Sequence, residues 1–232
     1  KLLAESRALK KSGSKLLESS GLLDILRKFG EIRIVGSYAA NLMVQRDIDI
    51  HIIRRKPFSK NDALSIFNEI VKKTKFNSYY IGDWNDTNIH HEFPKGYYIG
   101  LKVRYAGQKW KIDVWFLSSK EQGKFDRNGL DISKTTLSSA QREAILRLKT
   151  YRNQSGFKVP SQKIYEMVLN KKLSTIKDLK KIMATEEIIN LTKQTASYKK
   201  YEDKLQAPNA VDLSNILKKE LFEEDGELIN SN

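Results

Sequence analysis

The chain has 232 residues, 40% of them hydrophobic and 30% charged, which is enough to bury a core and is typical of a globular protein. It contains no cysteine, which excludes disulfides and cysteine-based zinc sites, and its three histidines argue against a histidine-built metal site. The net charge of +14 favours a phosphate-rich partner such as a nucleotide or a nucleic acid, although scattered lysines that only confer solubility are the alternative.

The first elements of the chain alternate between helical and strand patterns. Apolar residues at helical spacing predict a helix over 14–29, which Gly30 closes. Short apolar runs then predict strands over 31–35 and 47–53, with a short helix over 38–44 between them. The next helix begins at a capping box and has an apolar stripe on one face. The box is Ser59 with Asp62, and the stripe is Ala63, Phe67, Ile70 and Val71.

The middle of the chain predicts a short strand over 79–81, a long polar loop over 82–96 and a β-hairpin. The hairpin consists of "YYIGLKVRY" and "WKIDVWF", which turn at Gly107. After a turn at 128–129, helical patterns alone follow from residue 137 onward. The helical faces are Ala144, Leu148 and Tyr151; Ile164, Val168 and Leu169; Ile176, Leu179 and Met183; and Leu213, Ile216, Leu217 and Leu221.

These patterns predict an α+β fold with a mixed β-sheet and flanking helices, followed by an all-helical region. We expect one domain over 1–130 and a helical domain over 131–232 with a frayed acidic tail from residue 223. No apolar run approaches the roughly 18–20 residues of a membrane helix, and no signal-peptide pattern opens the sequence. We therefore expect a cytoplasmic protein with no membrane partner.

Two aspartates, Asp47 and Asp49, lie inside the apolar run of the second predicted strand. Because side chains alternate across a strand, both carboxylates share one face, about 7 Å apart at Cα, while Ile48 and Ile50 point the opposite way. Carboxylates this close raise each other's pKa unless a cation lies between them. Mg²⁺ prefers a few carboxylates together with phosphate oxygens and water. The pair therefore predicts a metal site that receives a nucleotide.

Asp113 carries the same signature, since it lies between two apolar residues in "WKIDVWF". Three strand carboxylates can hold two metal ions about 3.5–4 Å apart, an arrangement suited to in-line phosphoryl displacement. Gly36 permits a close approach of the backbone, and Ser37 at the start of a helix offers N–H groups and a hydroxyl to phosphate oxygens. Each feature alone is common in proteins, whereas their combination in this order is specific.

Together these residues resemble the nucleotidyltransferase superfamily that includes DNA polymerase β-like enzymes. That family has an apolar residue followed by Gly and Gly or Ser, then an acid-apolar-acid-apolar strand and a later apolar-acid-apolar strand. This sequence carries the three elements at 35–37, 47–50 and 112–114, and the resemblance extends over roughly 14–120. It implies a nucleotidyltransferase-type mixed sheet, while the helical second half carries no motif that matches.

The resemblance also implies roles for these residues. Asp47 and Asp49 would bind both metal ions, Asp113 would complete the metal site and help deprotonate the acceptor, and Ser37 together with Gly36 would hold the terminal phosphates. The implied cofactor is Mg²⁺ in a two-metal site, with Mn²⁺ as an alternative. The implied reaction transfers a nucleoside monophosphate from an NTP, by default ATP, to an acceptor and releases pyrophosphate.

Basic residues near the acids add further nucleotide-binding candidates. Lys111 lies two residues before Asp113 and so shares its face, and Lys102 and Arg104 share one face of the paired strand. A cation there could neutralise the triphosphate or pyrophosphate, although a solvated strand face is the alternative.

Two other polar stretches have less specific interpretations. The loop over 82–96 contains Trp84, His90, His91 and Glu92 and is either an acceptor- or base-recognition loop or an ordinary loop. Zinc binding by adjacent loop histidines is disfavoured, because their side chains rarely converge. Arg54 to Lys56 is either a nucleic-acid contact or a solvated strand exit.

Three functions therefore compete. The leading one is an active nucleotidyltransferase, whose acceptor is an RNA such as tRNA, a small molecule as in antibiotic-modifying relatives, or a protein. The basic net charge slightly favours RNA. The second is a non-catalytic nucleotide or nucleic-acid binding protein on the same fold, which the presence of all three acids disfavours. The third is a helical interaction protein, which leaves Ser37 and the acids unexplained.

Overall fold

A computed structural model describes residues 1–85, 94–127, 131–156 and 159–182, of which residues up to Leu179 belong to one compact unit. The elements of this unit follow one another in chain order. They are α1 (Leu2–Ser20), α2 (Leu22–Leu26), β1 (Glu31–Val35), α3 (Gly36–Ala39), β2 (Asp47–Arg54), α4 (Lys60–Lys73), β3 (Ser78–Asp83), β4 (Tyr97–Tyr105), β5 (Gln108–Ser118), α5 (Ser119–Arg127), a 3-10 helix (Ile132–Lys134), α6 (Ser139–Gln154) and α7 (Ser161–Leu169).

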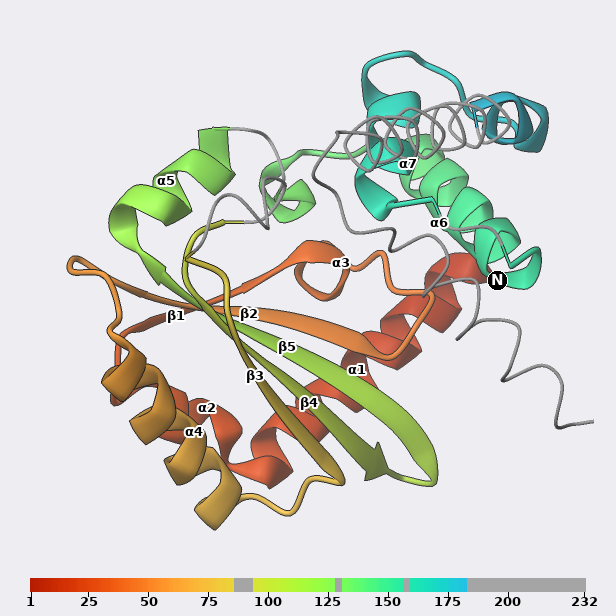
Figure 1. Cartoon of the computed structure of the whole chain (residues 1–232). Helices are drawn as coiled ribbons and strands as arrows, with labels where there is room; N and C mark the ends of the chain where they lie inside the picture. Colours follow the sequence, from red (N-terminus) through yellow and green to blue (C-terminus); the bar gives the residue numbers. More distant parts are fainter. Residues whose placement is uncertain (86–93, 128–130, 157–158, 183–232) are drawn as a thin grey trace, which may run out of the picture. The chain divides into compact units, whose positions relative to one another are not determined.

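The five strands form one mixed sheet in the order β1-β2-β5-β4-β3 (Figure 1). β2 and β5 run parallel, and every other neighbouring pair is antiparallel. The β4–β5 hairpin turns at Gly107, whose φ of 73° is readily adopted only by glycine. The sheet and its flanking helices confirm the predicted α+β class and agree with the nucleotidyltransferase-type fold that the resemblance implies.

One face of the sheet forms the hydrophobic core with α1, α2 and α4, which lie on the same side in Figure 1. Strand alternation explains which residues are buried: Ile48, Ile50 and Ile52 of β2 are fully buried and belong to this core. Burying such side chains contributes roughly 1.5–3 kcal/mol each. The opposite face therefore receives the alternate residues of β2, which include both predicted aspartates.

The described helices of the second half pack into the same compact unit as the sheet. Ala144 and Leu148 of α6 and Ile164 and Val168 of α7 are buried, as the helical periodicity predicts. Here α6 contacts both α7 and α1. The domain boundary near residue 130 stays a prediction. The turn at 128–129, the helical faces at Met183 and over 213–221, and the acidic tail lie outside the described residues.

Two predicted helices have different bounds in the structure. The helix expected over 14–29 is wrong, because α1 begins at Leu2 and ends at Ser20, and α2 is a separate element. Gly21 separates them in the left-handed conformation, with φ of 65°. The C-terminal glycine is thus Gly21 rather than Gly30. The helix expected over 38–44 is also displaced, since α3 begins at Gly36 and ends at Ala39.

The capping box of α4 is confirmed, because the side chains of Ser59 and Asp62 each bond the backbone N–H of the other. Its apolar stripe is corrected in two places. Ile66 is fully buried, whereas Val71 is 41% exposed. The helix α5 was not predicted, since its sequence "SKEQGKFDR" contains only one large apolar residue, Phe125. No helix in the described ranges has the length and apolarity needed to cross a membrane.

Candidate active site

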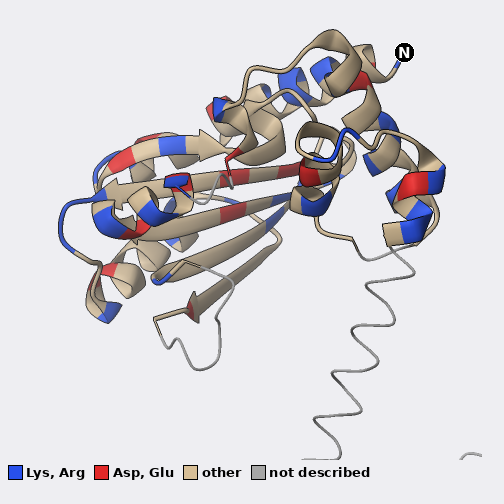
Figure 2. Cartoon of the chain, turned by 90° about the horizontal axis from the view of Figure 1, so that it is seen from above, with Lys and Arg blue, Asp and Glu red and all other residues tan. Residues whose placement is uncertain are grey.

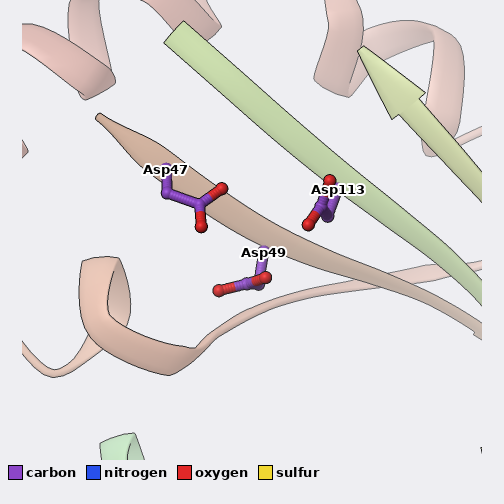
Figure 3. A group of neighbouring side chains, drawn as sticks. All are labelled: Asp47, Asp49 and Asp113. Carbon is purple, nitrogen blue, oxygen red and sulfur yellow. The ribbon is translucent and has the colours of Figure 1, made fainter. Parts of the chain in front are cut away.

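The three predicted aspartates converge on the face of the sheet opposite the core. Asp47 and Asp49 lie on β2, and Asp113 lies on the parallel neighbour β5, directly opposite Asp49 in the strand register. One carboxylate oxygen of each residue lies within 4.8 Å of the others (Figure 3). The parallel pairing of β2 with β5 therefore brings together residues that are 64 or more positions apart in the sequence.

The cluster fits a hard divalent cation. Its donors are all carboxylate oxygens, the ligands that Mg²⁺ prefers, and Oδ1 of Asp47 is buried without a hydrogen-bond partner among the described residues. Burial, followed by repulsion from Asp47 and Asp113, raises the pKa of Asp49 to about 7. Burial also raises the pKa of Asp47. A bound cation would offset both the desolvation and the repulsion.

A pocket of about 200 Å³ lies beside Asp47 and Asp49. Gly36 and Ser37 of α3 form part of its wall, so the structure brings the Gly-Ser pair to the acids as the sequence predicts. The remaining wall comes mainly from the second half of the chain. Those residues are Lys149 of α6, and Ser161, Gln162 and Tyr165 of α7.

Gly36 is required by the close approach of its backbone to Asp49. Its φ is 67°, and a Cβ built on it would lie 2.7 Å from Oδ2 of Asp49. We expect Gly36→Ala to displace this carboxylate and to lower nucleotide transfer about 100-fold, since a misplacement of about 1 Å has an effect of that size. The measurement is the rate of label transfer from a radioactive NTP.

Gly21→Ala is the matched control for this prediction. Gly21 has a similar φ of 65°, but nothing lies within 4 Å of its Cβ position. Both variants introduce similar backbone strain, about 1–2 kcal/mol, but only one disturbs the acids. Equal loss of transfer in both variants would contradict the role given to Gly36.

Lys149 is a site residue that the sequence interpretation missed. It is buried, and its Nζ donates to the carbonyl oxygen of Leu42 at 2.7 Å and to Oη of Tyr165 at 3.4 Å. Burial, together with the nearby Arg152, lowers the pKa of Lys149 to about 7. A signal for it exists in the sequence, because Lys149 and Arg152 occupy positions i+4 and i+7 from buried Ile145, where the helical period favours apolar residues.

Long-range bonds hold the segment between α3 and β2, and with it the Gly-Ser turn, in place. Arg142 of α6 donates to the carbonyl oxygen of Ala40 at 2.7 Å. Ala40 lies two residues before Leu42, the acceptor of the Lys149 bond. From α1, Lys10 donates to the carbonyl oxygen of Ala39 at 3.1 Å. The helix α6 therefore contributes Lys149 to the pocket wall, and its side chains also hydrogen-bond the backbone between α3 and β2.

Asp113 accepts a hydrogen bond on each of its oxygens. Oη of Tyr98 donates to Oδ1 at 2.7 Å, and Nζ of Lys111 donates to Oδ2 at 2.5 Å. The predicted residue Lys111 thus lies at the acids, and Tyr98 is a further neighbour that the sequence interpretation missed. Burial raises the pKa of the Tyr98 phenol, and the bonded Asp113 raises it further, so Tyr98 is the donor in this bond.

The other predicted basic residues lie farther along the sheet. Lys102 is opposite Lys111 in the register, and Arg104 is opposite Lys109. They line a second pocket rather than the one that contains Asp47 and Asp49. Arg54 pairs with Asp62 and bonds the carbonyl oxygens of two following residues, which favours a structural role at the strand exit. The cluster over 90–92 lies outside the described residues.

Several solved structures resemble this chain at low sequence identity. No protein-family model matches this sequence, and no curated protein matches it either. Among solved structures, Cid1, described as an RNA terminal uridylyl transferase, matches with a TM-score of 0.46 and 17% identity over 69% of this chain. The non-canonical poly(A) polymerase complex GLD-2–GLD-3 matches with a TM-score of 0.44 and 16% identity over 72%. The chain spans about half the length of these structures, 46% and 57% respectively.

Proposed function

We propose that this chain is a Mg²⁺-dependent nucleotidyltransferase that transfers a nucleoside monophosphate from an NTP to an acceptor hydroxyl and releases pyrophosphate. The observation that supports it is the convergence of Asp47, Asp49 and Asp113 beside a pocket lined by Ser37 and Lys149. A purely structural role would leave three acids clustered at an energetic cost. ATP is the default nucleotide, and Mn²⁺ is an alternative metal.

In the proposed reaction the acceptor oxygen forms a bond to the α-phosphorus, and the bond from that phosphorus to the bridging oxygen breaks. The electron pair of the broken bond leaves with pyrophosphate, and the hydroxyl proton passes to Asp113. Bound Mg²⁺ would supply Lewis-acid stabilisation of the phosphate charge. Ser37 and Lys149 hold phosphate oxygens, and Lys111 and Tyr98 fix the carboxylate of Asp113 through their hydrogen bonds.

We propose RNA as the acceptor, on the basis of the +14 net charge. Lysine and arginine are distributed over many elements rather than along one stripe (Figure 2), so the net charge by itself does not locate a binding face. A small-molecule hydroxyl and a protein hydroxyl are the alternatives, and a non-catalytic binder on the same fold is the second candidate function. The presence of all three clustered acids favours the enzyme over the binder.

We expect the purified chain, incubated with Mg²⁺ and each α-³²P-labelled NTP in a heat-treated cell extract, to transfer label to the RNA fraction. Fractionation into RNA, protein and small molecules separates the three acceptors. EDTA should abolish transfer, because without a metal ion the negative carboxylates repel the phosphates. Absence of transfer from all four NTPs, in Mg²⁺ and in Mn²⁺, would contradict the enzyme function and favour the binder.

A further inference from the structure

We propose that the open face of β4 and β5 is the acceptor site and that it takes the 3′ end of a single-stranded nucleic acid. This inference rests on the proposed function, because it assigns the acceptor of that reaction. It depends on the order of side-chain types along the two paired strands. Basic residues lie at one end, the acid lies in the middle and aromatic residues lie at the other end.

The strand register creates this order. Alternate residues of β5 share the face of Asp113, and each has a partner on β4 directly opposite. Two basic pairs come first, then the acid opposite a glycine, and then an aromatic pair. The pairs are Lys109 with Arg104, Lys111 with Lys102, Asp113 with Gly100, and Trp115 with Tyr98.

Gly100, which lies opposite Asp113, leaves room for the ring of Tyr98. A Cβ on Gly100 would lie 2.7 Å from Oη of Tyr98. The Tyr98 ring therefore extends over Gly100 to reach Asp113, to which it donates at 2.7 Å. This contact connects the aromatic end directly to the residue that is proposed to receive the acceptor proton.

Four aromatic rings gather at this end of the face. Tyr98 lies 5.2 Å from Trp115, 5.8 Å from Tyr80 and 6.3 Å from Trp84, measured between ring centroids. Cross-strand aromatic pairs can serve only to stabilise a sheet. Tyr80, however, is 56% exposed, so much of its ring surface is available for stacking. Aromatic side chains on an open sheet are the usual platform for unpaired nucleobases, because every base has a π-face.

The opposite end of the face borders a pocket of about 560 Å³, whose wall combines charged residues with Val103 and Trp110 from the core side of the strands. Its charged lining is Arg46, Lys102, Arg104, Lys109 and Lys111. Lys111 pairs with Asp113, whereas the other four cations form no ion pair with any acidic residue in the described ranges. Such a concentration of unneutralised positive charge favours a polyanion.

The dimensions favour a chain over a small molecule. Six residue steps separate Lys109 from Trp115, which corresponds to about 20 Å at about 3.3 Å per residue. A terminal base stacked near Tyr98 would place its 3′-hydroxyl at Asp113 and the preceding phosphates over the cations. A duplex end would keep its bases paired and would not offer them to the rings.

The test measures binding of a 5′-fluorescein-labelled 12-nucleotide RNA by anisotropy in EDTA without NTP, so it requires no catalysis. We expect Tyr80→Ala to weaken binding about tenfold, within the range that follows from losing one base–aromatic stack, and Tyr80→Phe to bind like the wild type. The salt dependence should be unchanged in both variants, because neither removes a phosphate contact.

The paired variant Lys102→Ala with Arg104→Ala should weaken binding and should also reduce the steepness of log K against log salt by about 1.4, at about 0.7 per lost single-strand contact. Lys60→Ala with Lys72→Ala removes the same charge from α4, which lies on the core face, and should leave the slope of the wild type. A 12-base-pair duplex should bind more weakly than the single strand, and a DNA single strand tests whether the sugar matters.

The proposal is overturned if the Tyr80 and Lys102–Arg104 variants bind the RNA like the wild type, or if the duplex binds as tightly as the single strand. A chain that transfers label to a protein or small molecule and does not bind the RNA would overturn this site and the RNA acceptor. The proposed nucleotidyltransferase activity would still stand. The expected binding pattern in a chain that transfers no label would support the site and contradict the proposed function instead.

Discussion

Asp49→Asn is expected to lower nucleotide transfer about 1,000-fold or more without unfolding the protein. Asn is nearly the same size as Asp, but it removes a charge that the metal site requires. Metal-assisted charge stabilisation contributes several kcal/mol to such a transition state, which corresponds to this loss of rate. The measurement is the initial rate of label transfer at saturating NTP and Mg²⁺.

Asp24→Asn is the control for this variant. Asp24 of α2 forms an exposed surface ion pair with Arg27, the residue that follows this helix, and such pairs contribute little to stability. Its transfer rate should equal that of the wild type. An Asp49→Asn protein that transfers label at the wild-type rate in Mg²⁺ would reject the three aspartates as the catalytic centre.

The same substitution should stabilise the metal-free protein in a pH-dependent way. The folded state raises the pKa of Asp49 from 3.8 to about 7, so it binds the proton more tightly than the unfolded state does. The contribution of Asp49 to stability is therefore fully present below pH 4 and is lost as the pH rises through 7. The Asn variant lacks this loss, and its advantage in free energy of unfolding should grow from near zero below pH 4 to about 4 kcal/mol at pH 8, at about 1.4 kcal/mol for each pKa unit.

Chemical denaturation of both proteins at several pH values measures this difference, and Mg²⁺ supplies an independent readout. The metal should stabilise the wild type, because it binds the folded state only, and should have little effect on Asp49→Asn. An equal effect of Mg²⁺ on both proteins would contradict metal binding at Asp49.

Lys149→Met is expected to raise the KM for NTP about 10- to 100-fold, the usual range for losing one charge-assisted hydrogen bond to a phosphate. Lys149 is buried in the pocket wall, so solvent screens its charge little. Steady-state kinetics measure the effect, and Lys72→Met, an exposed substitution on α4, is the matched control. An unchanged KM would contradict phosphate binding by Lys149.

The pH dependence gives this prediction a second readout. The pKa of Lys149 lies at about 7 in the protein without nucleotide, so its ammonium form is lost as the pH rises above 7. Affinity for NTP in the wild type should therefore fall between pH 6.5 and 9, and the wild type should approach the Met variant at the upper end. A ratio of the two affinities that stays constant over this range would show that the charge of Lys149 does not act on the nucleotide.

The sequence by itself determined the sheet residues that form the candidate site. Alternation of acids with isoleucines over 47–50 predicted which face of β2 is buried, and the structure confirms it. The Gly107 turn, the β4–β5 hairpin and the capping box at Ser59 were equally predictable. Each of these features depends on interactions between residues close in the chain, so a short stretch of sequence contains the information.

Tertiary structure alone decided what surrounds the acids. Lys149 reaches the pocket by bonding a carbonyl 107 residues earlier, and Tyr98 reaches Asp113 only because β4 pairs with β5 in one register. The exposure of Val71 also followed from packing rather than from the helical period. Local periodicity predicts which side of an element is apolar. The partners of a polar residue depend instead on which distant segments pack against it, and this packing is determined by the tertiary structure as a whole.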